Sequence, residues 1–346
     1  MKMTFRWYGE SDPVTLENIS QIPHMSGIVS AVYDVPVGEV WPNESIAKMK
    51  EQAAAHGLEF EVVESVPVPE EIKLGSEKAP ELIENYCENV RRLGTAGVKC
   101  ICYNFMPVFD WLRSELAHPQ QDGANALAYD EATVLAMNPL TSELSLPGWD
   151  ESYTKEELKA LLKRYEAIDE EKLWENLTAF LQKVIPVAEK SGVKMAIHPD
   201  DPPWGLFGLP RIITTEANLE RFLQIVDSPA NGLTFCTGSL GASADNDLVK
   251  MAGKFAKRIH FAHLRNILRT GDRKFEEVGH PTECGSIDLY NIVKNLVENG
   301  FDGYVRPDHG RMIWGETGRY GYGLYDRALG AAYLNGLFEA IEKDRA

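Results

Sequence analysis

The sequence predicts an α/β protein of the (β/α)8-barrel class, and two observations support this prediction. Short apolar runs alternate with segments of helical apolar spacing along the chain, and eight such runs can be counted. Parallel strands need crossover connections of this kind, and eight units in about this length are typical of a closed barrel. A doubly wound open sheet is the alternative. It predicts a glycine-rich phosphate turn after the first strand, and residues 7–13, WYGESDP, do not match one.

The first half of the chain contains four expected strands, which are short and rich in β-branched and aromatic residues. They are residues 3–8, 26–33, 58–65 and 98–105. Between them, a helix is expected from Asn43 to the stop at Gly57, because glycine commonly ends helices. A second helix is expected at 79–97, where apolar residues recur at helical spacing.

The second half repeats this alternation, with four more strands. They are residues 193–199, 232–238, 258–265 and 302–308. The expected helices around them show the same helical periodicity. They are residues 173–192, 216–226, 245–256 and 288–300, with a last helix starting near Tyr325. We therefore expect residues 1–346 to form one barrel domain.

One region interrupts this alternation of strands and helices, because residues 106–170 form a connection much longer than usual between the fourth and fifth strands. It contains a turn at Pro147–Gly148 and a helix expected from Thr154, whose side chain would form a capping box with Glu157. A surface excursion is one interpretation. We favour a lid or cap, since the segment follows a strand end on the face where barrels build their active sites.

Composition excludes several classes of partner. The formal net charge of −17 argues against nucleic acid and against an anionic membrane surface, but a small anionic substrate needs only a local basic pocket. The first ten residues do not resemble a signal peptide, and no apolar stretch is long enough to span a bilayer. The five cysteines are odd in number and mostly far apart. These features predict a reduced, cytoplasmic protein.

Four polar side chains stand at the ends of the last four expected strands. They are His198, Cys236, His263 and Asp308. In a barrel these carboxyl ends converge on one mouth, where active sites are built. Each residue alone is more often a satisfied polar group or a small core residue, but two imidazoles, a thiolate and a carboxylate together fit a divalent transition metal. We therefore expect a metal site. By contrast, Cys100 and Cys102 lie inside an apolar run and are expected to pack in the barrel.

Several longer motifs around these predicted strands resemble the mannonate dehydratase family, within the xylose-isomerase-like group of metal-dependent barrels. They are TFRWYG (4–9), IPHMSGIVSAVYDVPVGEVWP (22–42), YNFMPVFDW (103–111), IHPDDPP (197–203), TFCTGSLGA (234–242), IHFAHLRN (259–266), RPDHGR (306–311) and GRYGYGLYDRALGAAYLNG (318–336). The resemblance covers essentially the whole chain. It implies dehydration of D-mannonate to 2-keto-3-deoxy-D-gluconate in hexuronate (glucuronate) breakdown. It also implies Mn²⁺ or Fe²⁺, bound by the same four strand-end residues.

An elimination of this kind needs a base for the C2 proton and an acid for the departing hydroxyl. His309, beside Asp308, is the first candidate. Tyr325 and then Tyr322 are the next, and the sequence does not choose among the three. Arg311 and Arg265 could bind the substrate carboxylate, with structural ion pairs as the alternative.

Other polar or aromatic side chains near strand ends could line a substrate site, with loop structure as the alternative. They are Trp7, Asn104, Asp110, His280 and Arg306. Two rival functions remain at this stage: a metal-dependent sugar isomerase or epimerase on the same barrel, and a non-catalytic sugar-acid sensor. Related barrels often pair, so we also expect a homo-oligomer, most simply a dimer.

Overall fold

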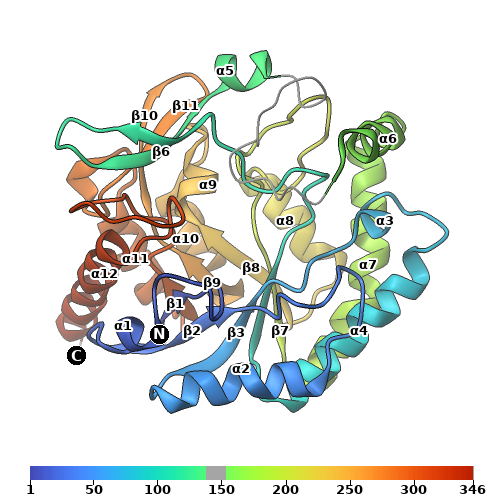
Figure 1. Ribbon diagram of the computed structural model, residues 1–346, viewed down its shortest axis with the longest axis horizontal. Helices are drawn as coiled ribbons and strands as arrows, with labels where there is room; N and C mark the ends of the chain where they lie inside the picture. Colours follow the sequence, from blue (N-terminus) through green and yellow to red (C-terminus); the bar gives the residue numbers. More distant parts are fainter. Residues whose placement is uncertain (138–152, 346) are drawn as a thin grey trace.

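The computed structural model describes residues 1–137 and 153–345, and its centre is a closed barrel of eight parallel strands (Figure 1). Around the barrel the order is β1, β2, β3, β4, β7, β8, β9 and β12, and β12 pairs with β1. The strands are β1 Lys2–Arg6, β2 Met25–Ser30, β3 Glu59–Glu64, β4 Cys100–Tyr103, β7 Lys194–Ile197, β8 Asn231–Cys236, β9 Ile259–His263 and β12 Tyr304–Arg306. The predicted (β/α)8 barrel is confirmed.

The barrel interior is filled by small and apolar side chains from neighbouring strands. Val29, Val62, Cys100, Cys102, Ala196 and Phe261 form a buried cluster of their own, separate from the main core. Their strand registers match, since Val62 pairs with Cys100 and Cys102 with Ala196. Cys100 and Cys102 therefore pack in the barrel, as the apolar run around them predicted. This packed layer closes the barrel below the site.

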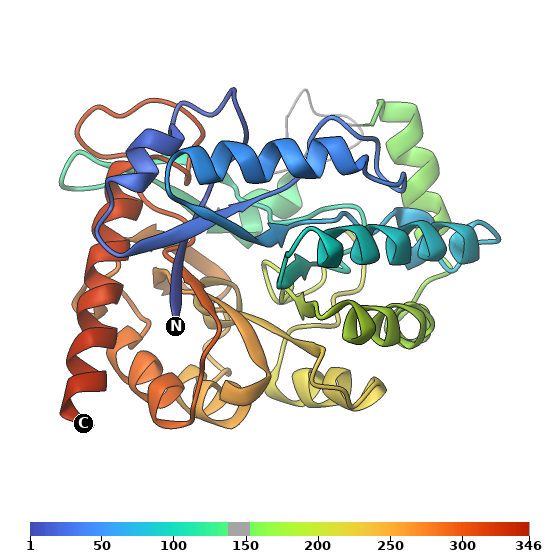
Figure 2. The same ribbon diagram turned by 90° about the horizontal axis from the view of Figure 1, so that it is seen from below.

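Helices cover the outside of the barrel (Figure 2). They are α1 Leu16–Ser20, α2 Asn43–Ala55, α3 Glu70–Lys73, α4 Ala79–Thr95, α5 Glu131–Ala136, α6 Lys155–Tyr165, α7 Glu170–Ser191, α8 Glu216–Ile225, α9 Thr237–Gly241, α10 Leu248–Phe255, α11 Leu289–Glu298 and α12 Tyr325–Asp344, with short 3-10 turns at Ala256–Arg258 and Thr282–Cys284. Helix α4 packs on α7, α10 on α11, and α11 on α12. Each does so through one apolar stripe, which is why their sequences are periodic.

Local signals set several helix ends as expected. Thr154 accepts a hydrogen bond from the Glu157 N–H, while the Glu157 carboxylate accepts one from the Thr154 N–H, which completes the predicted capping box of α6. Helix α7 ends at Gly192, whose φ of 67° lies in the left-handed region that glycine tolerates. Tyr325 is the first residue of α12. The turn expected at Pro147–Gly148 lies outside the described residues.

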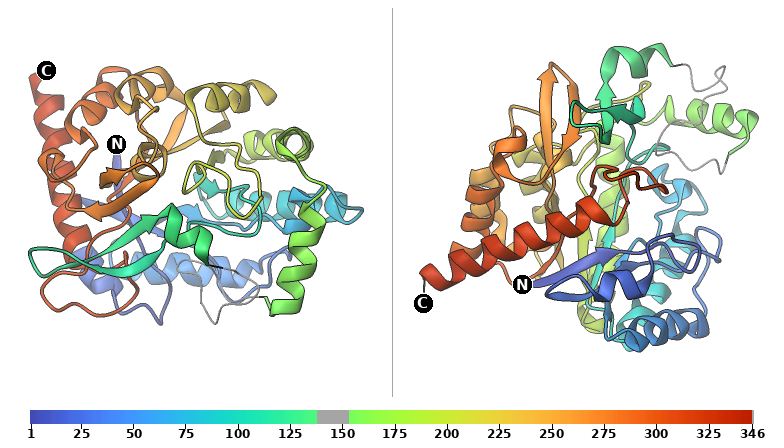
Figure 3. Two further views of the ribbon diagram at one scale, coloured as in Figure 1. Left: turned by 90° about the horizontal axis from the view of Figure 1, so that it is seen from above. Right: turned by 60° about the vertical axis from the view of Figure 1, so that its left-hand side comes forward.

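A second sheet stands beside the barrel mouth, and the sequence analysis did not foresee it. It is antiparallel, with the order β10, β11, β6, β5. Its strands are β5 Glu115–Pro119, β6 Asn125–Asp130, β10 Asn266–Gly271 and β11 Lys274–Val278. Figures 1 and 3 show the β10–β11 hairpin next to β6 and α5. Two long loops, one after β4 and one after β9, thus join into one structure through the pairing of β11 with β6.

Two further findings concern the chain as a whole. All five cysteines lie among the described residues and are free, so the expected absence of a disulfide framework is confirmed. Within residues 1–137 and 153–345, no helix is both long and apolar enough to cross a bilayer.

Candidate active site at the carboxyl end of the barrel

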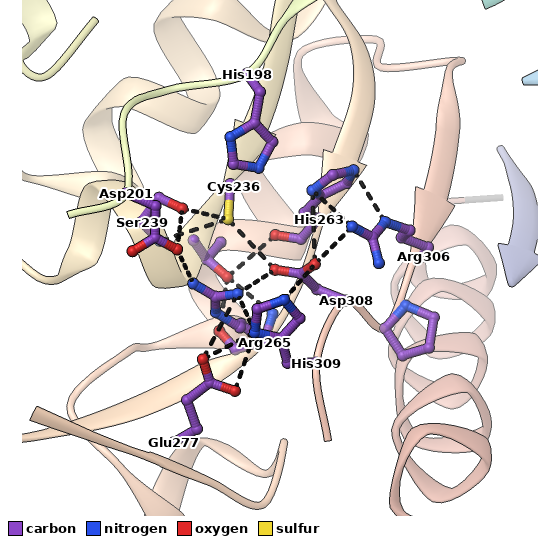
Figure 4. Close-up of polar contacts among 12 residues, drawn as sticks. His198, Asp201, Cys236, Ser239, His263, Arg265, Glu277, Arg306, Asp308 and His309 are labelled. Atoms are coloured by element: carbon purple, nitrogen blue, oxygen red, sulfur yellow. Dashed lines mark hydrogen bonds and ion pairs between the residues drawn. The ribbon is translucent and has the colours of Figure 1, made fainter. Parts of the chain in front are cut away.

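Strand register brings the predicted ligands together. Cys236 and His263 are the last residues of β8 and β9, and they are direct partners across the sheet. His263 in turn pairs with Arg306 on β12. His198 follows β7 by one residue, and Asp308 follows β12 by two. All of these side chains therefore meet at the carboxyl mouth of the barrel (Figure 4).

The Cys236 thiol is buried among charged groups. Its Sγ accepts hydrogen bonds from the Ser239 hydroxyl at 3.0 Å and the Ser239 N–H at 3.4 Å, and it lies 3.4 Å from Asp308 Oδ2. Burial and the Asp308 charge act to raise its pKa, but Arg265 and the two neighbouring imidazoles lower the pKa of Cys236 to about 6. This cysteine is a thiolate near neutral pH, the form that binds metals.

His198 faces the thiolate. Its Nδ1 lies 2.7 Å from the Pro199 carbonyl oxygen, so Nδ1–H donates to that oxygen and Nε2 is left for the site. Burial lowers the pKa of His198, but the hydrogen bond and charge of Cys236 outweigh burial and raise the pKa to about 9. The His198 and His263 rings lie 5.0 Å apart between centroids.

Asp308 is held by two arginines. Arg265 Nη1 donates to its Oδ2 at 2.8 Å, and Arg306 Nη2 lies 2.8 Å from its Oδ1. Burial would raise the pKa of Asp308, but Arg265 and Arg306 hold that pKa well below its usual range. His263 Nδ1 is 3.6 Å from Oδ1. With φ of 43°, Asp308 also adopts the left-handed backbone conformation, which is uncommon outside glycine and turns the carboxylate out of the line of β12.

Glu64, at the end of β3, was not identified from the sequence. Its Oε1 accepts from Arg306 Nη2 at 3.0 Å, and its Oε2 lies 3.5 Å from His263 Nε2 with no hydrogen-bond partner. Burial would raise the pKa of Glu64, but Arg306 and His263 hold the pKa well below its usual range. The Glu64 charge thus sits beside the proposed ligands and faces a position open to a cation or substrate.

His309 lies between a phenol and a carboxylate. Its Nε2 is 2.9 Å from the Tyr322 hydroxyl, and its Nδ1 is 2.9 Å from Glu277 Oε1 and 2.7 Å from Arg265 Nη1. Burial lowers the pKa of His309 despite the opposing charge of Glu277, and burial raises the pKa of Tyr322 well above its usual value. Trp111 packs on the imidazole, with 5.2 Å between ring centroids.

These groups surround a cavity of about 280 Å³, a size that suits a small molecule. The side chains that line it are Arg6, Tyr8, Glu64, Ser65, Cys102, Tyr103, Asn104, Asp110, Trp111, His198, Asp201, Arg265, Arg306, Asp308, His309, Arg319 and Tyr322. Four predicted substrate residues therefore line the cavity: Asn104, Asp110, Arg265 and Arg306. The Asn104 side-chain amide donates to Asp110 Oδ2 at 3.1 Å.

Besides Cys236 and His263, four candidates from the sequence do not line this cavity. Trp7 is buried behind it, and its carbonyl accepts from the Ser30 hydroxyl. His280 is buried against the Pro307 carbonyl, 2.7 Å from its Nε2. Arg311 forms ion pairs with carboxylates at 2.9 Å, and Tyr325 is 42% exposed with its ring on Trp314. Tyr322 lines the cavity and Tyr325 does not, because the chain turns between the two residues. Of the two tyrosines, Tyr322 is therefore the better candidate for an acid or base.

Sequence analysis missed other cavity residues. Arg6 and Tyr8 stand at the end of β1, in the TFRWYG motif, and Arg319 follows in the glycine-aromatic segment. Glu277 belongs to the unforeseen second sheet. A signal for that sheet exists: Gly271 and Asp272 stand at a tight turn between two short runs with apolar residues, which is typical of a hairpin.

The donor set fits a divalent transition metal. One ligand atom each from His198, Cys236 and His263 lies within 4.8 Å of the others, as a single bound ion requires. Asp308 adds a carboxylate next to two of them. The two imidazoles and the thiolate favour a transition metal such as Fe or Zn over Ca²⁺ or Mg²⁺, and the carboxylate is compatible with Mn, Fe and Zn.

A parallel barrel with this donor set and a cavity at its carboxyl mouth defines the class of metal-binding (β/α)8 enzymes. Within that class, the family model for D-mannonate dehydratase (UxuA) matches residues 1–346. The chain belongs to this family, and the resemblance drawn from its motifs is confirmed.

Proteins of known family match this chain over nearly its full length. The chain is 57% identical over 345 residues to a mannonate dehydratase of Streptococcus agalactiae serotype Ia, with 99% of each covered. It is 57% identical over 343 residues to mannonate dehydratase 2 of Halalkalibacterium halodurans, again with 99% of each covered. The crystal structure of a mannonate dehydratase from Streptococcus suis serotype 2 superposes with a TM-score of 0.93 at 49% identity, covering 100% of this chain and 96% of that one.

More distant structures share the fold alone. A xylose isomerase domain protein from Planctomyces limnophilus gives a TM-score of 0.58 at 13% identity, covering 99% of this chain and 98% of that one. This likeness agrees with the (β/α)8 barrel fold.

Proposed function

We propose that this chain is a hydro-lyase that removes water from D-mannonate to give 2-keto-3-deoxy-D-gluconate. One observation supports this function best: a buried imidazole–phenol pair lines the same cavity of about 280 Å³ as His198 and Asp308, which belong to the metal-binding donor set. Full-length relatives named mannonate dehydratase at 57% identity support the choice of substrate.

The reaction takes a proton from C2 and hydroxide from C3 of the sugar acid, and the resulting enol becomes the 2-keto product. We assign both proton transfers to His309 and Tyr322, at Nε2 and the phenol oxygen, because these atoms share a hydrogen bond and both residues line the cavity. Glu277 and Arg265 hold the other side of the imidazole, which fixes the direction of Nε2. Trp111 covers the ring and excludes water from it.

His198, Cys236, His263 and Asp308 would hold the metal, which the family resemblance suggests is Mn²⁺ or Fe²⁺. When bound, the metal supplies a positive charge that stabilises negative charge developing on the substrate oxygens. The arginines that surround Asp308 keep this residue ionised, the state in which a carboxylate can be a ligand.

We assign the substrate carboxylate to Arg6 and Arg319 rather than to Arg311 and Arg265. Both guanidinium groups lie on the Tyr8 ring, at 4.6 Å and 4.1 Å from its centroid, and both line the cavity. Among residues 1–137 and 153–345, no carboxylate forms an ion pair with either one. Arg265 already contacts two carboxylates at 2.8 Å. Arg6 Nη1 donates to the Glu64 carbonyl, but neither guanidinium is neutralised by a carboxylate in contact with it, so both can bind an incoming anion.

The segment 106–170 is proposed to act as a cap over this site. Asp110 and Trp111, near its start, are part of the cavity wall. Its strand β6 pairs with β11, the strand that carries Glu277, and β5 pairs with β6 at the edge of the same sheet. A location in the cytoplasm and a homodimeric assembly stay predictions, and light scattering of the purified protein would test the dimer.

The proposed function is tested by stripping the purified protein with a chelator and assaying 2-keto-3-deoxy acid formation from D-mannonate before and after adding Mn²⁺. Activity that disappears and returns is the expected result. If metal binds and no product forms from D-mannonate, the proposed reaction is wrong. Turnover of an aldose to a ketose would then support the isomerase or epimerase, and binding of sugar acids without turnover would support the sensor.

A further inference from the structure

Arg113 has an unusual environment for an arginine outside the cavity. It belongs to the long connection after β4, and it is fully buried. It does not line the cavity, so it touches no substrate there. Its guanidinium lies between the rings of Trp111 and Phe275, at 5.5 Å and 5.1 Å from their centroids. Burying a cation in this way costs several kcal/mol unless its hydrogen bonds are complete.

Those hydrogen bonds are complete. Nη1 donates to Asp201 Oδ1 at 2.9 Å and to the Leu112 carbonyl at 2.9 Å. Nη2 donates to Asp201 Oδ2 at 3.1 Å and to Glu277 Oε1 at 2.8 Å, while Nε donates to Glu277 Oε1 at 3.3 Å. All five N–H donors of the guanidinium are thus engaged. The side chain joins three segments: the connection after β4, the loop after β7 and strand β11.

Arg265 uses the same two carboxylates. Its Nη2 donates to Asp201 Oδ2 at 2.8 Å, and its Nη1 lies 3.7 Å from Glu277 Oε1. Arg113, Asp201, Arg265 and Glu277 therefore form a ring of alternating charge. Arg265 also reaches Asp308 at 2.8 Å and His309 Nδ1 at 2.7 Å. Without Arg113, the two carboxylates would have Arg265 as their remaining nearby arginine, and Coulomb attraction would draw it toward them.

We propose that Arg113 is a positioning residue for the reaction: by saturating Asp201 and Glu277 it leaves Arg265 directed at Asp308 and His309. This inference rests on the proposed function, because His309 and Asp308 take their roles from it. The inference also gives the second sheet a role in the reaction, because Glu277 lies on its strand β11 and accepts a hydrogen bond from Arg113. Lysine cannot replace Arg113, since a single ammonium cannot make two parallel pairs of bonds to separate carboxylates.

The test compares Arg113→Lys with Arg164→Lys. Arg164 also belongs to the 106–170 connection and forms a two-bond pair with Glu71, at 2.6 Å and 2.7 Å, but it is far from the cavity lining. For Arg113→Lys we expect kcat for D-mannonate to fall about 100-fold with KM within about twofold, because misplaced catalytic groups act on the transition state. For Arg164→Lys both constants should stay unchanged. Equal kcat in the two variants, or a rise of KM alone, overturns the proposal.

A crystal structure of the metal-loaded Arg113→Lys protein gives a readout that does not depend on turnover. The Arg265–Asp308 ion pair, at 2.8 Å in the native chain, should be lost, with the guanidinium moved toward Asp201 and Glu277. An unmoved Arg265 overturns the proposal. If the native protein itself does not convert D-mannonate, the proposed function fails, and the position of Arg265 still decides whether Arg113 holds it.

Two further variants keep the test decisive if Arg113→Lys does not fold. Glu277→Gln keeps the shape of the ring and removes one of the two carboxylates that would draw Arg265 away. Because Glu277 also contacts His309, its readout is the crystal structure rather than kcat, and the Arg265–Asp308 ion pair should be kept. Gly238→Ala displaces Arg265 directly, because a Cβ at Gly238 would stand 1.8 Å from Arg265 Nε. If kcat of Gly238→Ala stays native, the direction of Arg265 does not matter for turnover. If Arg265 leaves Asp308 in Glu277→Gln, attraction by the two carboxylates is not what Arg113 counteracts. Either result overturns the proposal.

Discussion

The Nε2 atom of His309 and the hydroxyl of Tyr322 lie 2.9 Å apart, although the two residues come from different parts of the loop that follows β12. Both are buried and both line the cavity. A hydrogen bond between an imidazole and a phenol gives a proton a direct path between two groups that differ in basicity. This contact is the reason for proposing that the pair moves protons on the substrate.

Replacing either member should remove most of the turnover. We expect His309→Asn and Tyr322→Phe each to lower kcat by about 100- to 10,000-fold, the usual range for loss of an acid or base, while metal content stays native. Steady-state kinetics together with metal analysis would check this. Tyr325→Phe is the matched control, since Tyr325 is exposed and should keep native kcat. A Tyr325→Phe enzyme as slow as Tyr322→Phe would contradict the assignment.

Cys236 should be needed for metal binding. The Cys236→Ser variant loses the thiolate and keeps the size of the side chain, so we expect metal affinity to fall by at least about 100-fold. Titration of the chelator-stripped protein with Mn²⁺ would measure it. Cys284→Ser is the control, because Cys284 is exposed and free. Native affinity in Cys236→Ser would show that the donor set is different from the one proposed.

Arg319 should determine the affinity for the substrate carboxylate. A charged hydrogen bond contributes about 1.5–3 kcal/mol, so Arg319→Met should raise KM about 10- to 100-fold with a smaller change in kcat. Arg311→Met provides the comparison, since Arg311 is paired with Asp122 and Asp326 and lies off the cavity. If Arg311→Met raises KM more than Arg319→Met does, the carboxylate site has been misplaced.

Acid should weaken the contribution of Glu277 to stability. Burial would raise the pKa of Glu277, but His309, Arg265 and Arg113 lower it from its usual 4.5 to about 2. A lowered folded-state pKa contributes stability that is present above pH 4.5 and is lost as pH falls toward 2. The difference in free energy of unfolding between native and Glu277→Gln proteins should therefore shrink from pH 6 to pH 3. Urea unfolding at both values measures it, and an equal or larger difference at pH 3 would refute this account.

The barrel could be predicted, and the candidate metal ligands placed on it, because their signals are local and repeated. Eight apolar runs separated by helical segments leave few alternatives to a closed parallel sheet. Once the strands are placed, the carboxyl end of each is known, and His198, Cys236, His263 and Asp308 all fall there. Helix caps such as Thr154 with Glu157 are equally local, and the structure confirms them.

The proton-transfer and substrate residues were harder to predict, because their positions depend on loops. Tyr322 and Tyr325 are three residues apart, yet one lines the cavity and the other points to solvent, since the turn before α12 separates them. Arg311 was predicted to bind the substrate carboxylate, but Asp122 and Asp326 occupy it, whereas Arg319, which the sequence analysis missed, lines the cavity. Whether an arginine can bind a substrate carboxylate depends on the acidic side chains that folding places beside it.

By itself, the sequence determined the barrel, the order of its strands and the four residues at their carboxyl ends, because periodicity and strand direction are properties of short segments. Only the tertiary structure decided how the loops after β4, β7 and β9 meet. The pairing of β6 with β11 and the contacts of Arg113 with Asp201 and Glu277 join segments 88 and 164 residues apart. No local pattern encodes such contacts, since they depend on burial and on charges that become neighbours only after the barrel has closed.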